Sequence, residues 1–141
     1  MGSEMCIRDS DKSKKKADLE RRCDIINSSG ADMVISIHQN SYVTPKAEGA
    51  QVFYYKKSEE SKRIAQIMQG ILGEKLGTTR QIKSDVNYYI LLHSKLPTII
   101  SECGFLSNPE EEQRLCTEEY QEKVADALYC GIIEYLMMNM K

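Results

Sequence analysis

The sequence predicts an α/β protein, a three-layer sandwich in which helices cover both faces of a mostly parallel or mixed sheet. Two short apolar runs, residues 33–37 and 98–100, have the length and composition of buried strands. Helical patterns stand before, between and after these runs. Helices that alternate with apolar strands give this architecture, which places functional groups at the strand ends.

Length and composition limit what such a fold contains. The chain has 141 residues, 41% of them apolar, and a net charge of −2, which indicates a single globular domain. No run approaches the ~18–20 apolar residues of a membrane span. No basic block indicates a nucleic-acid partner. The five cysteines contain no C-x-x-C pair, so we expect free thiols and neither a disulfide framework nor a thiolate zinc site.

The first helix is expected over residues 14–29. Leu19, Cys23 and Ile26 recur at helical spacing, and Gly30 follows as a candidate cap. The segment before it, residues 1–12, has no periodicity and no signal-peptide pattern. We therefore interpret residues 1–12 as a non-native or disordered leader, and residues 13–141 as the domain.

Two strands and a long helix follow. Residues 31–38 and 49–55 read as strands on either side of a polar turn. Ser58 then caps a helix that ends at Gly77. The apolar stripe of this helix predicts that it packs on the sheet: Ile64, Ile67, Met68, Ile71, Leu72 and Leu76.

The second half repeats the alternation. Residues 78–87 are expected to form a loop with a short edge strand, and residues 88–92 and 98–102 to form strands separated by a turn at Pro97. Asn108 and Pro109 then begin a short helix, with Glu111 at the capping-box position. A final helix, 118–138, carries an apolar face that should cross the sheet.

One ionisable residue follows each of the two apolar runs. His38 comes after residues 33–37 and Glu102 after residues 98–100, so both are expected at the rim of the sheet. A hydrolytic zinc site uses about three protein ligands and a water of lowered pKa, and a separate carboxylate moves the proton. His38 is a candidate metal ligand, and Glu102 a candidate catalytic carboxylate. Each taken alone fits a structural role at least as well.

The two segments resemble a known family. Residues 36–40 (SIHQN) and 102–108 (ECGFLSN), with Arg22 and Asn27 upstream, are similar to the zinc-dependent N-acetylmuramoyl-L-alanine amidases of bacterial cell walls, the amidase_3 family. The similarity runs from about residue 17 to 135 and includes the separation of 64 residues between His38 and Glu102. Residues 49–55 and 87–91 most resemble the spore-cortex and germination members.

The resemblance implies a peptidoglycan hydrolase. It would cleave the amide between N-acetylmuramic acid and L-alanine, with Zn²⁺ as cofactor, His38 as a metal ligand and Glu102 as the general base. Asn40 would orient substrate or ligand, or simply form a turn. Arg22 and Asn27 are expected to be structural. The partners would be glycan strands and stem peptides in the cell envelope or outside the cell, and no motif identifies an activator protein.

The chain departs from the family pattern in one respect. The family begins with a strand that ends in a Gly-His-Gly-Gly-type motif and a helix that supplies a Glu ligand, and neither motif occurs here. We therefore expect the first strand and helix of the fold to be missing, one sheet edge to be open, and this chain to be inactive as written. His93 matches no family ligand position and is expected to be exposed or to cap a helix.

Two alternatives stay open. A thiol hydrolase would pair Cys103 with His38, because an imidazole lowers the pKa of a neighbouring thiol. A non-catalytic peptidoglycan-binding or regulatory module would keep the fold without the chemistry. Resistance to iodoacetamide would exclude the thiol mechanism, and peptidoglycan binding without turnover would favour the module.

Overall fold

A computed structural model describes residues 12–85 and 87–140. Nearly all of the predicted leader lies outside them. The helices are α1 Lys12–Ser28, α2 Glu59–Leu76, α3 Tyr89–His93, α4 Pro109–Leu115 and α5 Glu118–Asn139. The strands are β1 Val34–Asn40, β2 Gln51–Tyr54, β3 Lys83–Ser84 and β4 Thr98–Phe105.

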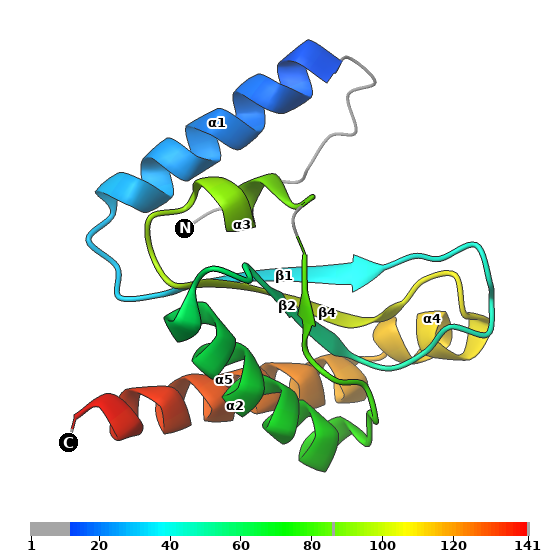
Figure 1. Ribbon diagram of the computed structural model, residues 1–141. Coiled ribbons are helices and arrows are strands. Elements are labelled where there is room, and N and C mark those ends of the chain that lie inside the picture. The colour runs from blue at the N-terminus through cyan, green and yellow to red at the C-terminus, as the bar shows by residue number, and fades with distance from the viewer. Residues whose placement is uncertain (1–11, 86, 141) are drawn as a thin grey trace.

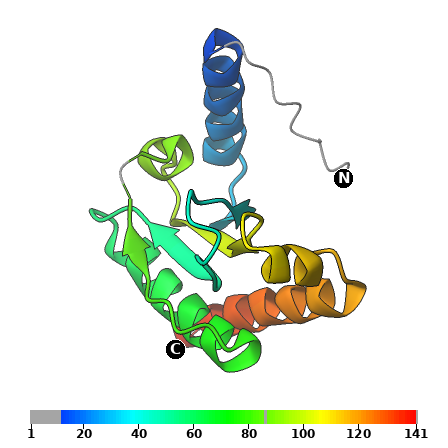
Figure 2. The same ribbon diagram turned by 90° about the vertical axis from the view of Figure 1, so that its right-hand side faces the viewer.

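The four strands form one mixed sheet in the order β1-β4-β2-β3. β1 is parallel to β4, β2 is antiparallel to β4, and β3 is parallel to β2. Helices α2 and α5 lie on one side of the sheet, and α1 and α3 on the other (Figure 1). The view from the side shows α1 standing away from the rest (Figure 2). The predicted α/β architecture with a mixed sheet and helices on both faces is confirmed.

The main core lies between the sheet and helices α2 and α5. All eight residues of β4 are buried. Alternate β4 residues, Ile99 and Cys103 among them, pack with Met68 and Leu72 of α2 and with Leu128 of α5. A smaller cluster on the opposite face joins Phe53, Leu91 and Ile100. Because side chains alternate along a strand, β4 contributes to both layers.

Helix α2 begins and ends as predicted. The Ser58 hydroxyl accepts a hydrogen bond from the Ser61 amide, and Gly77 ends the helix with φ of 74°. Glycine adopts this left-handed conformation without the steric cost of a Cβ atom. The buried face of the helix contains Ile64, Met68, Ile71 and Leu72 from the predicted stripe.

The predicted strand at residues 88–92 is wrong. The segment forms the short helix α3, in which the Ser94 amide donates to the Ile90 carbonyl. Leu91 is buried against Phe53 and Ile100, with Tyr88 packed on the same cluster. Residues three apart lie on one face of a helix, and a five-residue apolar run is too short to distinguish that period from a strand.

Glu111 does not form the predicted capping box. Asn108 caps α4 as expected, accepting from the amides of Glu110 and Glu111. The buried Glu111 carboxylate accepts instead from the amides of Phe105 and Gly49, at 2.8 and 2.9 Å. Glu111 therefore ties the end of β4 to the loop before β2. Gly104 permits this approach, since a Cβ there would lie 3.4 Å from the Glu111 Oε2 atom.

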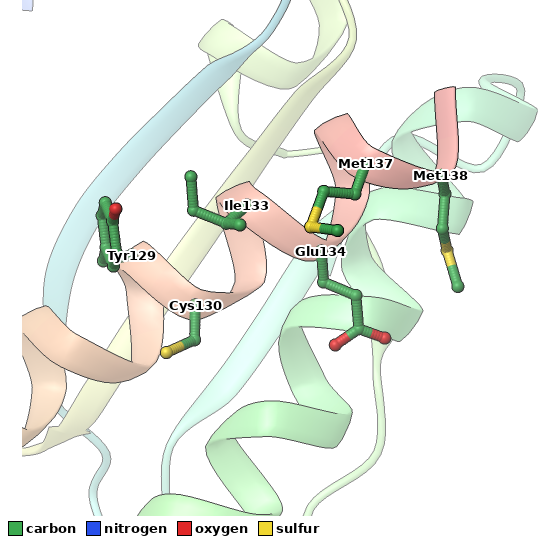
Figure 3. A pocket seen from close by; sticks show the side chains of 6 residues that line it. All are labelled: Tyr129, Cys130, Ile133, Glu134, Met137 and Met138. Atoms are coloured by element: carbon green, nitrogen blue, oxygen red, sulfur yellow. The ribbon is translucent and has the colours of Figure 1, made fainter. Parts of the chain in front are cut away.

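Strand β1 is at one edge of the sheet formed by the described residues. Ile37 on this strand is 55% exposed. Helix α5 also has a mostly apolar outer face (Figure 3), formed by Tyr129, Cys130, Ile133, Met137 and Met138 with the charged Glu134 among them. Within residues 12–85 and 87–140, no helix has the length and apolar character needed to cross a membrane.

Candidate active site

His38 and Glu102 are direct neighbours across two parallel strands. Their Cα atoms are register partners in the β1–β4 pair. Register partners of adjacent strands point to the same face of the sheet, with backbones about 4.8 Å apart. The preceding partners on that face are Ser36 and Ile100. The sheet therefore brings the imidazole and the carboxylate together on the face that carries α3.

Glu102 is a buried carboxyl group with few partners. It is 4% exposed, and its Oε2 atom has no hydrogen-bond partner among the described residues. The Tyr88 hydroxyl donates to Oε1 across 3.4 Å, which is long for such a bond. Burial raises the pKa of Glu102, and the Tyr88 bond offsets this only in part. A carboxyl group with a raised pKa is better suited to accept a proton than an exposed one.

Tyr88 was not recognised from the sequence as a site residue. Its ring meets Phe53 edge to face, with centroids 5.5 Å apart. Burial, followed by the charge of Glu102, raises the pKa of Tyr88 to about 12. The hydroxyl therefore stays protonated and acts as a donor to Glu102. Tyr88 lies beside Glu102 because of the position of α3. The sequence predicted a strand at residues 88–92 instead of this helix, so it gave no indication of the contact.

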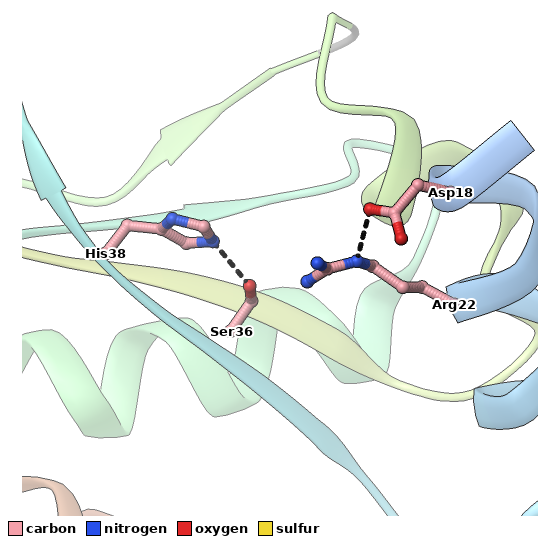
Figure 4. A network of polar contacts seen from close by, with 4 residues as sticks. All are labelled: Asp18, Arg22, Ser36 and His38. Atoms are coloured by element: carbon pink, nitrogen blue, oxygen red, sulfur yellow. Dashed lines mark hydrogen bonds and ion pairs between the residues drawn. The ribbon is translucent and has the colours of Figure 1, made fainter. Parts of the chain in front are cut away.

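The surroundings of His38, an exposed residue of β1, favour its neutral form. Its Nε2 atom lies 2.7 Å from the Ser36 hydroxyl oxygen, two residues earlier on the same strand face (Figure 4). Partial burial of the ring, followed by the positive charge of Arg22, lowers the pKa of His38. Neutral imidazole is the form that binds a metal ion. A cation would bind at Nδ1, or at Nε2 with loss of the Ser36 contact.

Arg22 approaches the candidate site from α1. Its Nε atom donates to Asp18 Oδ2 at 2.8 Å, one turn earlier in α1. The guanidinium group points toward Ser36 and His38 (Figure 4). After the larger effect of burial, its positive charge contributes to the lowered pKa of His38. The helical spacing of the sequence gave no signal for this long-range approach.

Asn27 is structural, as predicted. Its side-chain amide donates to the His93 carbonyl and accepts from the Lys95 amide, at 3.1 and 2.7 Å. These bonds attach the end of α1 to the turn after α3. His93 itself is exposed in the last turn of α3 and stacks on the Tyr89 ring, with centroids 4.0 Å apart.

Asn40 occupies the end of β1. Its side-chain oxygen accepts from the Ser41 amide at 2.8 Å, and its carbonyl accepts from the Leu106 amide at 2.8 Å. The register of the β1–β4 pair shifts between His38 and Asn40. In this arrangement the Asn40 side chain stabilises the turn that leaves the strand.

The geometry does not support the thiol alternative. Cys103 is 1% exposed and packs in the main core, on the opposite face of β4 from Glu102. Burial raises the pKa of its thiol to about 11. A nucleophilic cysteine needs a lowered pKa and access to substrate. Cys103 has neither and lies on the wrong side of the sheet to meet His38.

The described residues supply an incomplete set of metal ligands. No group of three or more His, Cys, Asp or Glu side chains within residues 12–85 and 87–140 is arranged to hold a metal ion. His38 offers one imidazole, and Glu102 offers a buried oxygen without a partner. A zinc site in a protein usually takes three or four protein ligands. A complete site therefore does not fit the described residues by themselves.

Comparison with known proteins identifies the class. The family model described as N-acetylmuramoyl-L-alanine amidase matches residues 4–134. The chain belongs to this family of peptidoglycan amidases, Amidase_3. It is 42% identical over 123 residues to the germination-specific N-acetylmuramoyl-L-alanine amidase of Bacillus subtilis. This match covers 86% of this chain and 52% of that protein.

Solved structures agree with the family assignment. The CwlD amidase of Clostridioides difficile, determined in complex with the GerS lipoprotein, superposes with a TM-score of 0.85 at 35% identity. The match covers 97% of this chain and 72% of that one. The catalytic domain of CwlV from Paenibacillus polymyxa gives a TM-score of 0.76 at 30% identity, over 84% of this chain and 65% of that one. The chain spans about half the length of the curated relatives that it matches.

Proposed function

We propose that this protein serves in the hydrolysis of the amide bond between N-acetylmuramic acid and L-alanine in peptidoglycan. The observation that carries the proposal is the register pair of His38 and Glu102, with a buried carboxylate oxygen that has no partner among the described residues. Membership in the amidase family and the similarity to a germination-specific amidase support the substrate class. The spore cortex is the proposed substrate, and the cell envelope the proposed location.

Glu102 is the proposed general base. With a raised pKa it takes a proton from the attacking water and later delivers that proton to the leaving alanine nitrogen. Tyr88 remains neutral and steadies Oε1, which leaves Oε2 as the oxygen that moves the proton. Asn40 is proposed, secondarily, to orient the substrate from the end of β1.

Zn²⁺ is the proposed cofactor, with His38 as one ligand. A bound zinc ion would supply Lewis-acid chemistry at the scissile amide. His38 contributes a neutral imidazole, and Arg22 favours that form. Because the described residues do not complete a three-ligand set, we expect the 141-residue chain alone to hydrolyse little.

A chimera tests the proposal. This chain would replace the 123 matching residues of the Bacillus subtilis relative, and purified peptidoglycan would be assayed for new N-terminal L-alanine. We expect chelator-sensitive release, lowered about 10²-fold or more by Glu102→Gln and strongly by His38→Ala. Glu112→Gln, an exposed glutamate of α4, is the matched control. Full activity in the folded Glu102→Gln chimera would refute the assignment of the base.

A non-catalytic wall-binding module is the second candidate. The incomplete ligand set among the described residues favours it. This candidate function predicts that the chimera binds peptidoglycan but releases no peptide, although circular dichroism shows it folded.

The GerS lipoprotein in the CwlD complex suggests that an envelope protein partner also belongs to the proposed function, and co-purification would identify it.

A further inference from the structure

Three large apolar side chains are exposed just beyond the candidate site. Tyr42 is 60% exposed, Val43 91% and Leu106 46%. Tyr42 and Val43 follow the end of β1, and Leu106 follows the end of β4. We call these three residues the rim patch. Single exposed apolar residues are ordinary, but several beside the strand ends that carry candidate site residues are a candidate binding surface.

Hydrogen bonds hold the two halves of the rim patch together. The Leu106 amide donates to the Asn40 carbonyl at 2.8 Å, and the Tyr42 amide donates to the Ser107 hydroxyl at 2.9 Å. The backbone that carries Tyr42 is therefore fixed to the backbone that carries Leu106. A side chain on a fixed backbone loses less conformational entropy when it binds a ligand.

The rim patch lies within reach of a substrate at the candidate site. Tyr42 follows His38 by four residues, and Leu106 follows Glu102 by four. At about 3.3 Å per extended residue, this separation is at most about 13 Å. A glycan strand whose muramic acid lactyl amide lies at Glu102 is long enough to span this distance.

The chemistry of the rim patch suits sugar better than peptide. Amino sugars present an apolar C–H face and an acetamido methyl group, which pack against aromatic and branched aliphatic side chains. The residues of the patch and the adjoining Ser107 carry no charge. Acidic stem peptides would instead be recognised by cationic groups.

We propose that Tyr42, Val43 and Leu106 bind the glycan strand of peptidoglycan, with the Tyr42 ring packed on a sugar face. The inference rests on the proposed function for its substrate class. It goes beyond that function by assigning the glycan to a particular surface.

Binding of the 141-residue chain to glycan strands stripped of stem peptides tests the proposal, because it requires neither zinc nor turnover. We expect Tyr42→Ala to weaken co-sedimentation about tenfold, and Leu106→Ala to weaken it as well. Tyr42→Phe should retain binding. Tyr129→Ala is the matched control, since Tyr129 is similarly exposed, at 63%, on the outer face of α5. Thermal unfolding would verify that each variant is folded.

Several outcomes overturn the proposal. They are wild-type binding by folded Tyr42→Ala, an equal loss in Tyr129→Ala, or binding of free stem peptides but not of glycan. A patch that binds only a protein from the envelope also overturns it. Failure of the hydrolase proposal is separate: an inactive chimera together with Tyr42-dependent glycan binding would leave this inference standing.

Discussion

At the scale of single residues, Glu102 is placed at a cost to stability. A buried carboxyl group with one unsatisfied oxygen disfavours its charged form, and proteins keep such groups mainly at functional sites. Ser101, beside it in the sequence, also has a buried oxygen without a partner among the described residues. The first of these unsatisfied atoms is explained by the proposed proton transfer. We have no physical account of the second.

Glu102→Gln should therefore stabilise the fold at neutral pH. The pKa of Glu102 is raised in the folded protein, so the folded state binds more protons than the unfolded state, and stability falls as pH rises above the ordinary carboxyl pKa of about 4.3. Gln carries no charge at any pH, so the substitution should raise the free energy of unfolding at neutral pH by roughly 0.5–2 kcal/mol. Urea unfolding at acidic and neutral pH measures it. A variant that is less stable than wild type at neutral pH would contradict the prediction, and Glu112→Gln is the exposed control.

Tyr88→Phe should raise the pKa of Glu102 further. The tyrosine hydroxyl stabilises the charged carboxylate, and its bond is the influence that lowers this pKa. Carbon-13 NMR titration of the glutamate carboxyl groups would follow the change. Tyr55→Phe, in the same apolar cluster, should leave the titration of Glu102 unaltered. An unchanged or lowered pKa in Tyr88→Phe would show that the 3.4 Å contact has no influence.

At the scale of elements, the close crossing of α2 and α5 depends on Gly131. A Cβ at this position would lie 2.6 Å from the Met68 sulfur, whereas one at Gly70 of α2 would meet nothing within 4 Å. Met68 is fully buried. The two glycines therefore have different reasons to be present, although both lie within helices.

A matched pair of substitutions separates those reasons. Gly131→Ala should destabilise the protein by about 1–3 kcal/mol, because Met68 must leave its packed position. Gly70→Ala should stabilise it by about 0.5–1 kcal/mol, because alanine favours the helix. Thermal melting of both variants measures the contrast. Equal shifts in the same direction would mean that the crossing has room to adjust.

Glu111 joins three elements through one side chain. Glu111→Ala would leave the buried Phe105 amide and the half-buried Gly49 amide without their acceptor, which should lower the free energy of unfolding by about 1–3 kcal/mol for the buried group and by less for the other. Glu110→Ala, at the exposed neighbouring position, should change stability by less than about 0.5 kcal/mol. Chemical denaturation provides the comparison. Similar midpoints for the two variants would show that the ties from α4 are dispensable.

At the scale of the whole molecule, we expect weak zinc binding. The candidate site offers one imidazole, and the described residues contain no group of three donors; affinity grows with the number of fixed ligands. Isothermal titration of the 141-residue chain measures it. A sub-micromolar affinity would contradict the expectation, and His38→Ala tests whether any observed binding involves that imidazole.

The sequence predicted most of the fold because its strongest patterns coincide with the buried surfaces. The apolar stripe of α2 and the two apolar runs gave the layers and placed His38 and Glu102 at strand ends. Their shared register depended on strand pairing, which no local pattern specifies. Tyr88, Arg22 and Glu111 were missed or misassigned because their contacts join segments far apart in the chain.

Because Cys103 is buried in the main core, its thiol can be used to detect local opening of that core. A thiol-reactive dye labels the exposed Cys116 immediately. It reaches Cys103 only when α2 and α5 separate from the face of β4 opposite Glu102. The labelling rate of Cys103 therefore measures how often the core around β4 opens. If added glycan or metal ion lowers this labelling rate, binding on one face of the sheet reduces the opening of the helical layer on the other face.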